Sequence, residues 1–278
     1  MNPDFPSLQI LPVKSLAVHE RHDDQRTPPL IERMRASGVL RNPPIVTPLQ
    51  DGSDRYMVLD GANRTTAMQK MGIPHVLAQV VQPNDPGLEL KTWNHVLWEF
   101  DADQFIQGIK NIGSISIKAL KQSSDLERKW AADTLVKVQT PDGSSHSVST
   151  TSDDFSTRIQ TMHLVVDSYK DLAKMDRTLI HAVQDLNGLY DNLSGIVIFP
   201  PFLIEDVLAL CAAGNLLPAG ITRFTISPRA LRVNYSLDEL SSSKSIELKN
   251  ETFERWMHER VARKGVRYYS EATVLFDE

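Results

Sequence analysis

The chain has a single cysteine, Cys211, among its 278 residues, and this scarcity excludes several classes of protein. One thiol cannot form a disulfide framework within the chain, and a zinc site of the Cys/His type cannot be assembled around it. The cysteine lies in the apolar run LIEDVLALCAAG, which predicts a helix that ends at Gly214. We therefore expect Cys211 to be a small core residue.

Long apolar runs and a surplus of positive charge are lacking as well. No stretch approaches the roughly 18 apolar residues of a membrane-spanning helix, and the first residues do not resemble a secretory signal. We therefore expect a cytoplasmic protein with no membrane partner. The formal net charge is -5, whereas a protein that coats nucleic acid needs an excess of Lys and Arg. Nucleic acid is accordingly not an expected partner.

The first part of the sequence predicts a compact unit of mixed α/β type that ends near residue 82. The expected elements are a strand over SLQILPVKSLAV with a proline kink, a helix from Pro28-Pro29 to about Gly38, a hairpin of strands 45–49 and 56–59, a helix to about Met71, and a strand at HVLAQVVQ. The Pro/Gly-rich segment QPNDPGLEL marks a boundary. We therefore expect two domains, residues 1–82 and 83–278.

The second part is also predicted to be mixed α/β. The expected elements are a helix that starts in LKTWNHVLWEF and carries Trp93 and Trp98, a hairpin around Pro141-Asp142-Gly143, a buried strand at GIVIFPP, short strands within ITRFTISPRALRVNYSL, an amphipathic helix over ETFERWMHERVARKG and a final strand at RYYSEATVLFD. Residues 100–200 offer no motif that indicates a role.

The stretch LDGANR, residues 59–64, combines several features of a phosphate site. Asp60 follows a predicted strand, where ligands of α/β units tend to lie. Gly61 lets the backbone approach a ligand, and the helix that follows presents unpaired N–H groups to an anion. Arg64 adds a bidentate donor, and Asn63 adds a neutral one. The same residues also suit an ordinary Asp-Gly turn with a solvated arginine, so the motif alone does not decide.

The polar loop VHERHDDQR follows the first predicted strand and supplies further carboxylates. A carboxylate at a strand end acts as a general base when the fold brings it close to a bound hydroxyl. His19 and His22 are three residues apart in this loop, but no third ligand stands at a spacing typical of a metal site. Asp23, Asp24 and Asp60 form at most a weak carboxylate cluster for a nuclease.

These stretches, together with LPVKSLAVHE, RNPPIVTP and TWNH, resemble the ParB/sulfiredoxin-like superfamily, in which a turn with Asp-Gly-x-x-Arg grips nucleotide phosphates. The segment LLPAGITRFTISPRALRV makes the chain similar to the free L-serine kinases of that superfamily, especially those of siderophore (staphyloferrin B) biosynthesis. The resemblance implies a ParB/sulfiredoxin-like N-terminal domain and a larger C-terminal domain that completes an amino-acid pocket. The implied reaction transfers a phosphate from ATP or ADP, with Mg²⁺, to the hydroxyl of free L-serine.

The resemblance also implies roles for individual residues. Glu20 matches the catalytic glutamate, and Asp60 matches the essential aspartate beside the reacting hydroxyl or Mg²⁺. The implied nucleotide- and phosphate-binding residues are Asn42, Pro43, Gly61, Asn63, Arg64 and Thr65. The implied substrate-binding residues are Trp93, Thr222 and Arg223.

One departure leaves an alternative open. Family members often carry histidine between the glycine and the arginine of the turn, whereas this chain has Ala62 and Asn63 there. Asparagine brings no positive charge to a phosphate. A regulator that binds a nucleotide or DNA without turnover, or a kinase for another small hydroxyl compound, therefore stays in view. Sulfiredoxin chemistry is excluded because residues 61–64 include no cysteine.

Overall fold

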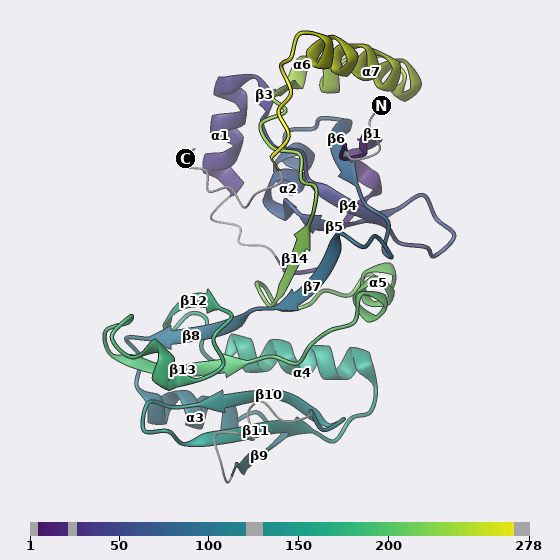
Figure 1. Cartoon of the computed structure of the whole chain (residues 1–278). Helices are drawn as coiled ribbons and strands as arrows, with labels where there is room; N and C mark the ends of the chain where they lie inside the picture. Colours follow the sequence, from purple (N-terminus) through teal and green to yellow (C-terminus); the bar gives the residue numbers. More distant parts are fainter. Residues whose placement is uncertain (1–4, 22–26, 121–129, 270–278) are drawn as a thin grey trace.

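The computed structural model describes residues 5–21, 27–120 and 130–269. Its elements form two lobes, with the strands β7 (Leu88–Thr92) and β14 (Thr222–Ile226) between them (Figure 1). These two strands pair in antiparallel fashion, with Thr222 opposite Thr92. The connection between the lobes is therefore made by two segments that lie far apart in the sequence.

The first lobe is built on a mixed five-stranded sheet in the order β1-β6-β4-β5-β2. Its strands are β1 (Leu8–Pro12), β2 (Leu16–Val18), β4 (Ile45–Pro48), β5 (Tyr56–Asp60) and β6 (His75–Val80). The helices α1 (Thr27–Ser37) and α2 (Ala62–Lys70) contact each other on this lobe. The predicted hairpin, helices and strand of residues 27–80 are thus confirmed.

The first predicted strand is divided in the structure. Pro12 ends β1, a 3-10 turn over Val13–Ser15 redirects the chain, and β2 begins at Leu16. The two strands occupy opposite edges of the sheet, so a kink in one strand was too simple an expectation. The fixed φ of proline and its missing N–H explain why the pairing of β1 stops there.

The second lobe contains an antiparallel six-stranded sheet in the order β12-β8-β13-β10-β11-β9. Its strands are β8 (Asn94–Trp98), β9 (Ile115–Ala119), β10 (Thr134–Gln139), β11 (Ser145–Thr150), β12 (Lys174–Thr178) and β13 (Leu193–Ile198). The helices α3 (Ala102–Lys110), α4 (Phe155–Asp167) and α5 (Ile204–Ala212) share its apolar core. The predicted hairpin, buried strand and Cys211 helix are confirmed.

The helix expected in LKTWNHVLWEF is wrong. This segment forms β7 and β8, and Trp93 lies between the two strands. Four successive residues from Asn94 to Leu97 are buried, because Leu97 packs into the main apolar core and Val96 packs into a second cluster with Val183 and Leu186. A strand buried on both faces shows no alternation of apolar and polar residues, and its apolar run is easily taken for a helix.

The last described helices return to the first lobe (Figure 1). The strand pair of β3 (Val39–Leu40) and β15 (Tyr235–Ser236) leads into α6 (Leu237–Ser241), and α7 (Ile246–Ala262) then packs on β1. Phe253 of α7 is buried in the apolar cluster that also holds Ile10 and Met68. The amphipathic C-terminal helix is confirmed, whereas most of the predicted final strand lies outside the described residues.

Candidate active site

Two parallel strands bring Glu20 and Asp60 to the same end of the first sheet. The strand β2 pairs in parallel with β5, and the register places Val18 opposite Val58. Glu20 stands two residues after Val18, and Asp60 stands two residues after Val58. Both carboxylates therefore follow the carboxyl ends of neighbouring strands, which is where ligands of α/β units bind.

The side chain of Glu20 is held by the loop that precedes β14. A backbone bridge joins Glu20 to Leu217. The Oε2 atom accepts a hydrogen bond from the Gly220 N–H at 2.8 Å, and Oε1 accepts from the Thr222 N–H at 2.6 Å and lies 2.5 Å from the Thr222 hydroxyl. The side chain is 16% exposed. The carboxylate is thus oriented by three donors and still borders solvent.

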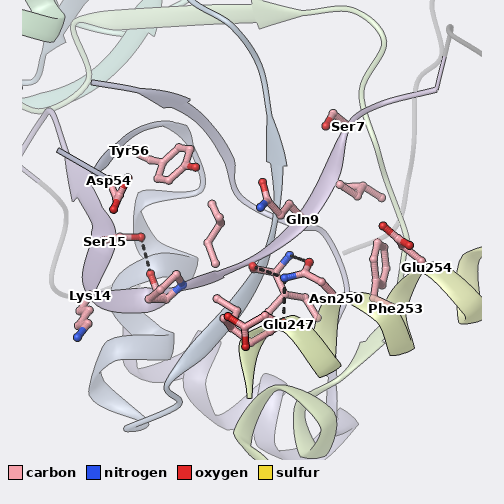
Figure 2. A pocket seen from close by; sticks show the side chains of 15 residues that line it. Ser7, Gln9, Lys14, Ser15, Asp54, Tyr56, Glu247, Asn250, Phe253 and Glu254 are labelled. Carbon is pink, nitrogen blue, oxygen red and sulfur yellow. Dashed lines mark hydrogen bonds between the residues drawn. The ribbon is translucent and has the colours of Figure 1, made fainter. Parts of the chain in front are cut away.

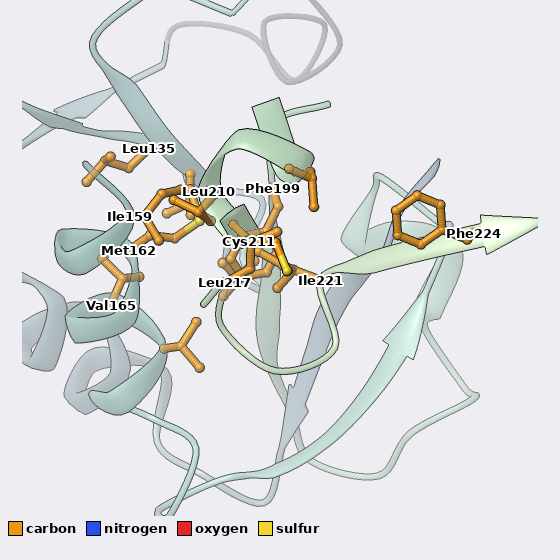
Figure 3. Close-up of a cluster of buried hydrophobic side chains, with 14 of the residues drawn as sticks. Leu135, Ile159, Met162, Val165, Phe199, Leu210, Cys211, Leu217, Ile221 and Phe224 are labelled. Carbon is orange, nitrogen blue, oxygen red and sulfur yellow. The ribbon is translucent and has the colours of Figure 1, made fainter. Parts of the chain in front are cut away.

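This loop is anchored in the apolar core (Figure 3). Leu217 and Ile221 are fully buried there, next to Cys211, which is 2% exposed. The Cys211 thiol lies 3.7 Å from the Val18 carbonyl oxygen, and burial raises the pKa of the thiol to about 11. Cys211 is therefore a core residue, as expected, and it packs behind the segment that supports Glu20.

A buried histidine supports the same loop from the second lobe. The Nε2–H of His95 donates to the Gly220 carbonyl oxygen at 3.3 Å, and Nδ1 accepts from the Tyr169 hydroxyl at 2.8 Å. Burial lowers the pKa of His95 to about 4. A neutral imidazole satisfies both contacts, so His95 fixes the position of Gly220, whose N–H reaches Glu20.

The Asp60 carboxylate lies between two arginines. It accepts from Arg64 at 2.9 Å, and Arg229 contributes a second hydrogen bond to the same oxygen. The Arg64 guanidinium also donates to the carbonyl oxygens of Asn42 at 2.9 Å and Pro43 at 3.5 Å. Arg64 therefore joins the two segments that the sequence assigned to phosphate binding. Arg229 was not predicted as a site residue. Its position in the basic run RALR, just after the proposed pocket loop, could have indicated it.

The turn at Gly61 requires glycine for two reasons. Its φ is +93°, and a Cβ there would lie 3.0 Å from the Nε atom of Arg64. The helix α2 begins at Ala62 without a side-chain cap. The Oδ1 atom of Asn63 and the Oγ1 atom of Thr65 are buried and have no hydrogen-bond partner among the described residues. Two buried polar atoms without a hydrogen-bond partner among the described residues thus lie in the first turn of this helix.

The three predicted substrate-binding residues are brought together by the β7/β14 pair. The Arg223 guanidinium lies 4.5 Å from the centroid of the Trp93 ring, a cation–π geometry. The Trp93 N–H donates to the Ile221 carbonyl oxygen at 2.9 Å, immediately before Thr222. Trp93 and Arg223 are both partly exposed. A planar cation on an aromatic face is thus available beside the Glu20 loop.

The described residues of this site do not include a cluster of metal ligands. Residues 5–21, 27–120 and 130–269 contain no group of three or more His, Cys, Asp or Glu that could hold a metal ion. His22, Asp23 and Asp24 lie outside these ranges. A nucleotide-bound Mg²⁺ commonly takes one or two protein carboxylates, with phosphates and water as the other ligands. Asp60 supplies a single carboxylate, and its side chain is 36% exposed, which fits this mode of binding.

A groove lies elsewhere in the structure. It has a volume of about 770 Å³ and runs between β1 and α7 (Figure 2). Asn250 of α7 pairs there with the edge of β1, donating to the Ile10 carbonyl and accepting from the Ile10 N–H. None of the predicted site residues is among the described residues that line the groove. Its chemistry therefore does not bear on Glu20 and Asp60.

The fold is that of the free serine kinases. A free serine kinase in complex with AMP superimposes with a TM-score of 0.69 at 15% identity, over 86% of this chain and 98% of that one. An ADP complex of a variant in which a glutamate is replaced by alanine gives a TM-score of 0.70 at 14% identity, over 86% and 98% of the two chains. The mixed α/β class expected from the sequence is confirmed.

The sequence adds a more particular relationship. The chain is 25% identical to the ATP-dependent L-serine kinase SbnI of Staphylococcus aureus over 290 aligned positions, which span 100% of both chains. A C-terminally truncated SbnI structure has a TM-score of 0.75 at 23% identity, over 94% of this chain and 100% of that one. An ATP-dependent L-serine kinase of Staphylothermus marinus is 37% identical over 84 residues, 30% of this chain and 33% of that protein. No protein-family model matches.

The chain is therefore a full-length homologue of SbnI, and the resemblance to the free L-serine kinases is confirmed. No described helix is long and apolar enough to cross a membrane.

Proposed function

We propose that this protein is an ATP-dependent kinase of free L-serine, with O-phospho-L-serine as product. The observation that carries the proposal is the placement of Glu20. Glu20 and Asp60 occupy equivalent positions at the ends of paired strands, and donors from the segment 217–222 orient the Glu20 carboxylate. The full-length similarity to an ATP-dependent L-serine kinase supplies the reaction class.

Glu20 acts as the general base in this proposal. Its carboxylate takes the proton of the serine hydroxyl as that oxygen attacks the γ-phosphorus and ADP leaves. The serine carboxylate fits the Arg223 guanidinium, which the Trp93 ring holds in place. Phosphoryl transfer depends mainly on positioning and charge neutralisation, and these side chains provide both.

The nucleotide phosphates belong at the start of α2. Arg64 and Arg229 bring two positive charges to Asp60, and the uncapped helix start presents backbone N–H groups to an anion. The buried oxygens of Asn63 and Thr65 suit hydroxyl or amine donors of a nucleotide. Asn42 and Pro43 border this place because Arg64 ties their carbonyl groups to it. Asparagine in place of histidine lowers the positive charge of the turn but leaves these contacts intact.

Asp60 is the residue that would hold Mg²⁺. The ion, when bound to the nucleotide, neutralises charge on the transferred phosphate. Asp60 itself keeps Arg64 and Arg229 oriented toward the phosphate region through its Oδ2 atom.

We also propose that residues 1–82 form a ParB/sulfiredoxin-like nucleotide-binding domain, and that residues 83–278 complete the serine pocket. The strand–turn–helix from β5 through Gly61 to α2 supports the first assignment. The Trp93–Arg223 pair supports the second, because both residues follow the boundary. The product would suit a downstream step that replaces the phosphate of O-phosphoserine.

The proposal is tested by incubating the purified protein with Mg²⁺, L-serine and either ATP or ADP. We expect O-phosphoserine with ATP, detected by mass spectrometry and phosphorus NMR. Product with ADP alone would reassign the donor. No product from either donor despite measurable nucleotide binding would overturn the kinase. Parallel reactions with threonine and homoserine test the acceptor.

A further inference from the structure

His19 is buried beside the proposed base and makes two polar contacts. It precedes Glu20 in the chain and is 6% exposed. Its Nδ1 atom lies 2.7 Å from the Val58 carbonyl oxygen, and its Nε2 atom lies 2.8 Å from the Thr222 hydroxyl oxygen. The Phe224 ring packs edge-on against it at a centroid distance of 5.4 Å. The imidazole therefore stands in one defined orientation between β5 and β14.

A count of hydrogens shows that these contacts leave room for one additional proton. The Val58 carbonyl can only accept, so Nδ1 of His19 carries a hydrogen. The Thr222 hydroxyl has one hydrogen but lies within hydrogen-bond distance of both His19 Nε2 and Glu20 Oε1. Two contacts need two hydrogens, so the second contact gains its hydrogen only when Nε2 or Oε1 carries one. His19, Thr222 and Glu20 thus form a hydrogen-bonded row. This row can hold one more proton than a neutral imidazole, a hydroxyl and a carboxylate carry together.

We propose that His19 takes up, through the Thr222 hydroxyl, the proton that Glu20 removes from the acceptor hydroxyl. This inference rests on the proposed kinase reaction. In that step the serine O–H bond breaks and its proton passes to Glu20, while the new O–P bond forms and the bond from phosphorus to the ADP oxygen breaks. Glu20 then gives its proton to the Thr222 oxygen, and the Thr222 hydroxyl gives its own to Nε2 of His19.

The end state of this relay is a carboxylate beside an imidazolium. The Nε2 atom of His19 lies 3.9 Å from Oε1 of Glu20, so the two charges attract each other in a poorly hydrated place. Glu20 returns to the form that can accept a proton, and the imidazolium releases its proton to water before the next turnover. His19 is thus a positioning residue that acts through Thr222, and it need not touch serine.

Four groups face the His19 ring: the Val58 carbonyl from β5, the Thr222 hydroxyl and the Phe224 ring from β14, and the neighbouring Glu20 carboxylate. The buried His95 is a useful contrast, because its two contacts are satisfied by a neutral ring and its pKa is lowered to about 4. The Nε2 atom of His19 instead faces a hydroxyl that also contacts Glu20, so a proton can pass to it from that carboxylate.

The first arm of the test is kinetic and uses a wild-type enzyme that forms O-phosphoserine. Thr222→Val keeps the shape of the side chain but removes the hydroxyl, and His19→Gln removes the group that takes the proton. We expect each to lower kcat about 10- to 100-fold with the KM for serine changed less than about 3-fold. Thr222→Ser restores the hydroxyl and should recover at least about 10-fold of the loss.

The double variant separates a relay from a structural role. Because both changes interrupt one path, His19→Gln combined with Thr222→Val should lose no more kcat than the more affected single variant. Multiplied losses, or a folded His19→Gln enzyme with wild-type kcat, would contradict the relay. Should His19→Gln fail to fold, the comparison of Thr222→Val with Thr222→Ser still decides, and equal kcat values for the two would overturn it.

The second arm needs no activity and so separates this proposal from the kinase assignment. Ring ¹⁵N chemical shifts of His19 in the full chain report which nitrogens carry hydrogen. We expect a hydrogen on Nδ1 and none on Nε2 in the enzyme before substrate binds, because only an Nε2 atom without hydrogen can take up the proton. An Nε2 atom that already carries a hydrogen in the enzyme without substrate would overturn the relay, whether or not O-phosphoserine is formed.

Discussion

At the scale of single residues, the two carboxylates of the site depend on neighbours from distant parts of the chain. Glu20 is oriented by the N–H groups of Gly220 and Thr222, and Asp60 is oriented by Arg64 and Arg229. The strand–turn–helix pattern indicated Asp60, and the resemblance to the free L-serine kinases indicated Glu20. They could not identify the partners from residues 217–229, because those contacts exist only after the lobes meet.

The buried His95 leads to a prediction about acid stability. Burial makes its protonation harder in the folded state, where the pKa is about 4, than in the unfolded state, where it is near 6.5. The unfolded chain therefore binds more protons below pH 6.5, and stability is lost as the pH falls from about 6.5 toward 4. This group contributes about 3 kcal/mol over that window.

Urea unfolding of the wild type at pH 7 and pH 5 measures this loss. In His95→Gln the difference between the two pH values should shrink, whereas the exposed His258→Gln should keep it. An unchanged difference in His95→Gln would show that other groups govern the acid sensitivity.

At the scale of elements, the loop before β14 gives a matched pair of glycine variants. Gly220 and Gly214 both have a φ of +75°, so alanine strains the backbone at either position. A Cβ at Gly214 meets no described atom within 4 Å, and the nearest atoms to a Cβ at Gly220 belong to the end of the flexible, exposed Arg177 side chain, which can move away. The Gly220 N–H bonds to Glu20, whereas the Gly214 N–H bonds to the Cys211 carbonyl. Relaxation of the backbone strain in Gly220→Ala should therefore displace the N–H that holds Glu20, and Gly214→Ala should not.

We expect both changes to cost about 1–2 kcal/mol of stability from strain. Only Gly220→Ala should also lower kcat, by about 10-fold or more, because the base is misplaced. The measurement is kcat together with urea unfolding for each variant. Equal kcat values would mean that the loop does not position Glu20.

The elements also show what sequence patterns could and could not predict. The hairpin 45–60, the Asp-Gly turn and the helix at Cys211 follow local rules of alternation, turn residues and caps, and these predictions are confirmed. The strand β8 does not follow them, because Leu97 and Val96 pack into two separate apolar clusters, which only the folded chain brings together. The division of the first strand at Pro12 depends on which sheet edge each half occupies, and this too is set by tertiary structure.

At the scale of the whole molecule, the chain begins and ends its described course in the same lobe. The helix α7 packs on β1, and its Phe253 is 3% exposed between Tyr235 and Trp256. The first lobe therefore depends on residues far beyond its own stretch of sequence. The candidate site lies away from this contact, so a substitution here should lower the stability of the protein without lowering its activity.

Phe253→Ala tests this separation. Loss of a buried aromatic side chain should cost about 3–5 kcal/mol of unfolding free energy. The kcat of the folded enzyme should stay close to that of the wild type well below the unfolding temperature. Leu248→Ala, on the same helix but 43% exposed, should change stability by less than about 0.5 kcal/mol. A large loss of kcat in Phe253→Ala would couple α7 to the site and contradict this account.

The role of Glu20 as the base of a serine kinase is tested by replacing its carboxylate with an amide. O-Phosphoserine formation from ATP and L-serine is measured for the wild type and Glu20→Gln, with Glu99→Gln at an exposed ion pair as the control. We predict loss of at least about 100-fold in kcat for Glu20→Gln, with ATP affinity retained, because an amide cannot accept the proton. A Glu20→Gln enzyme that is folded and turns over at the wild-type rate would contradict the claim.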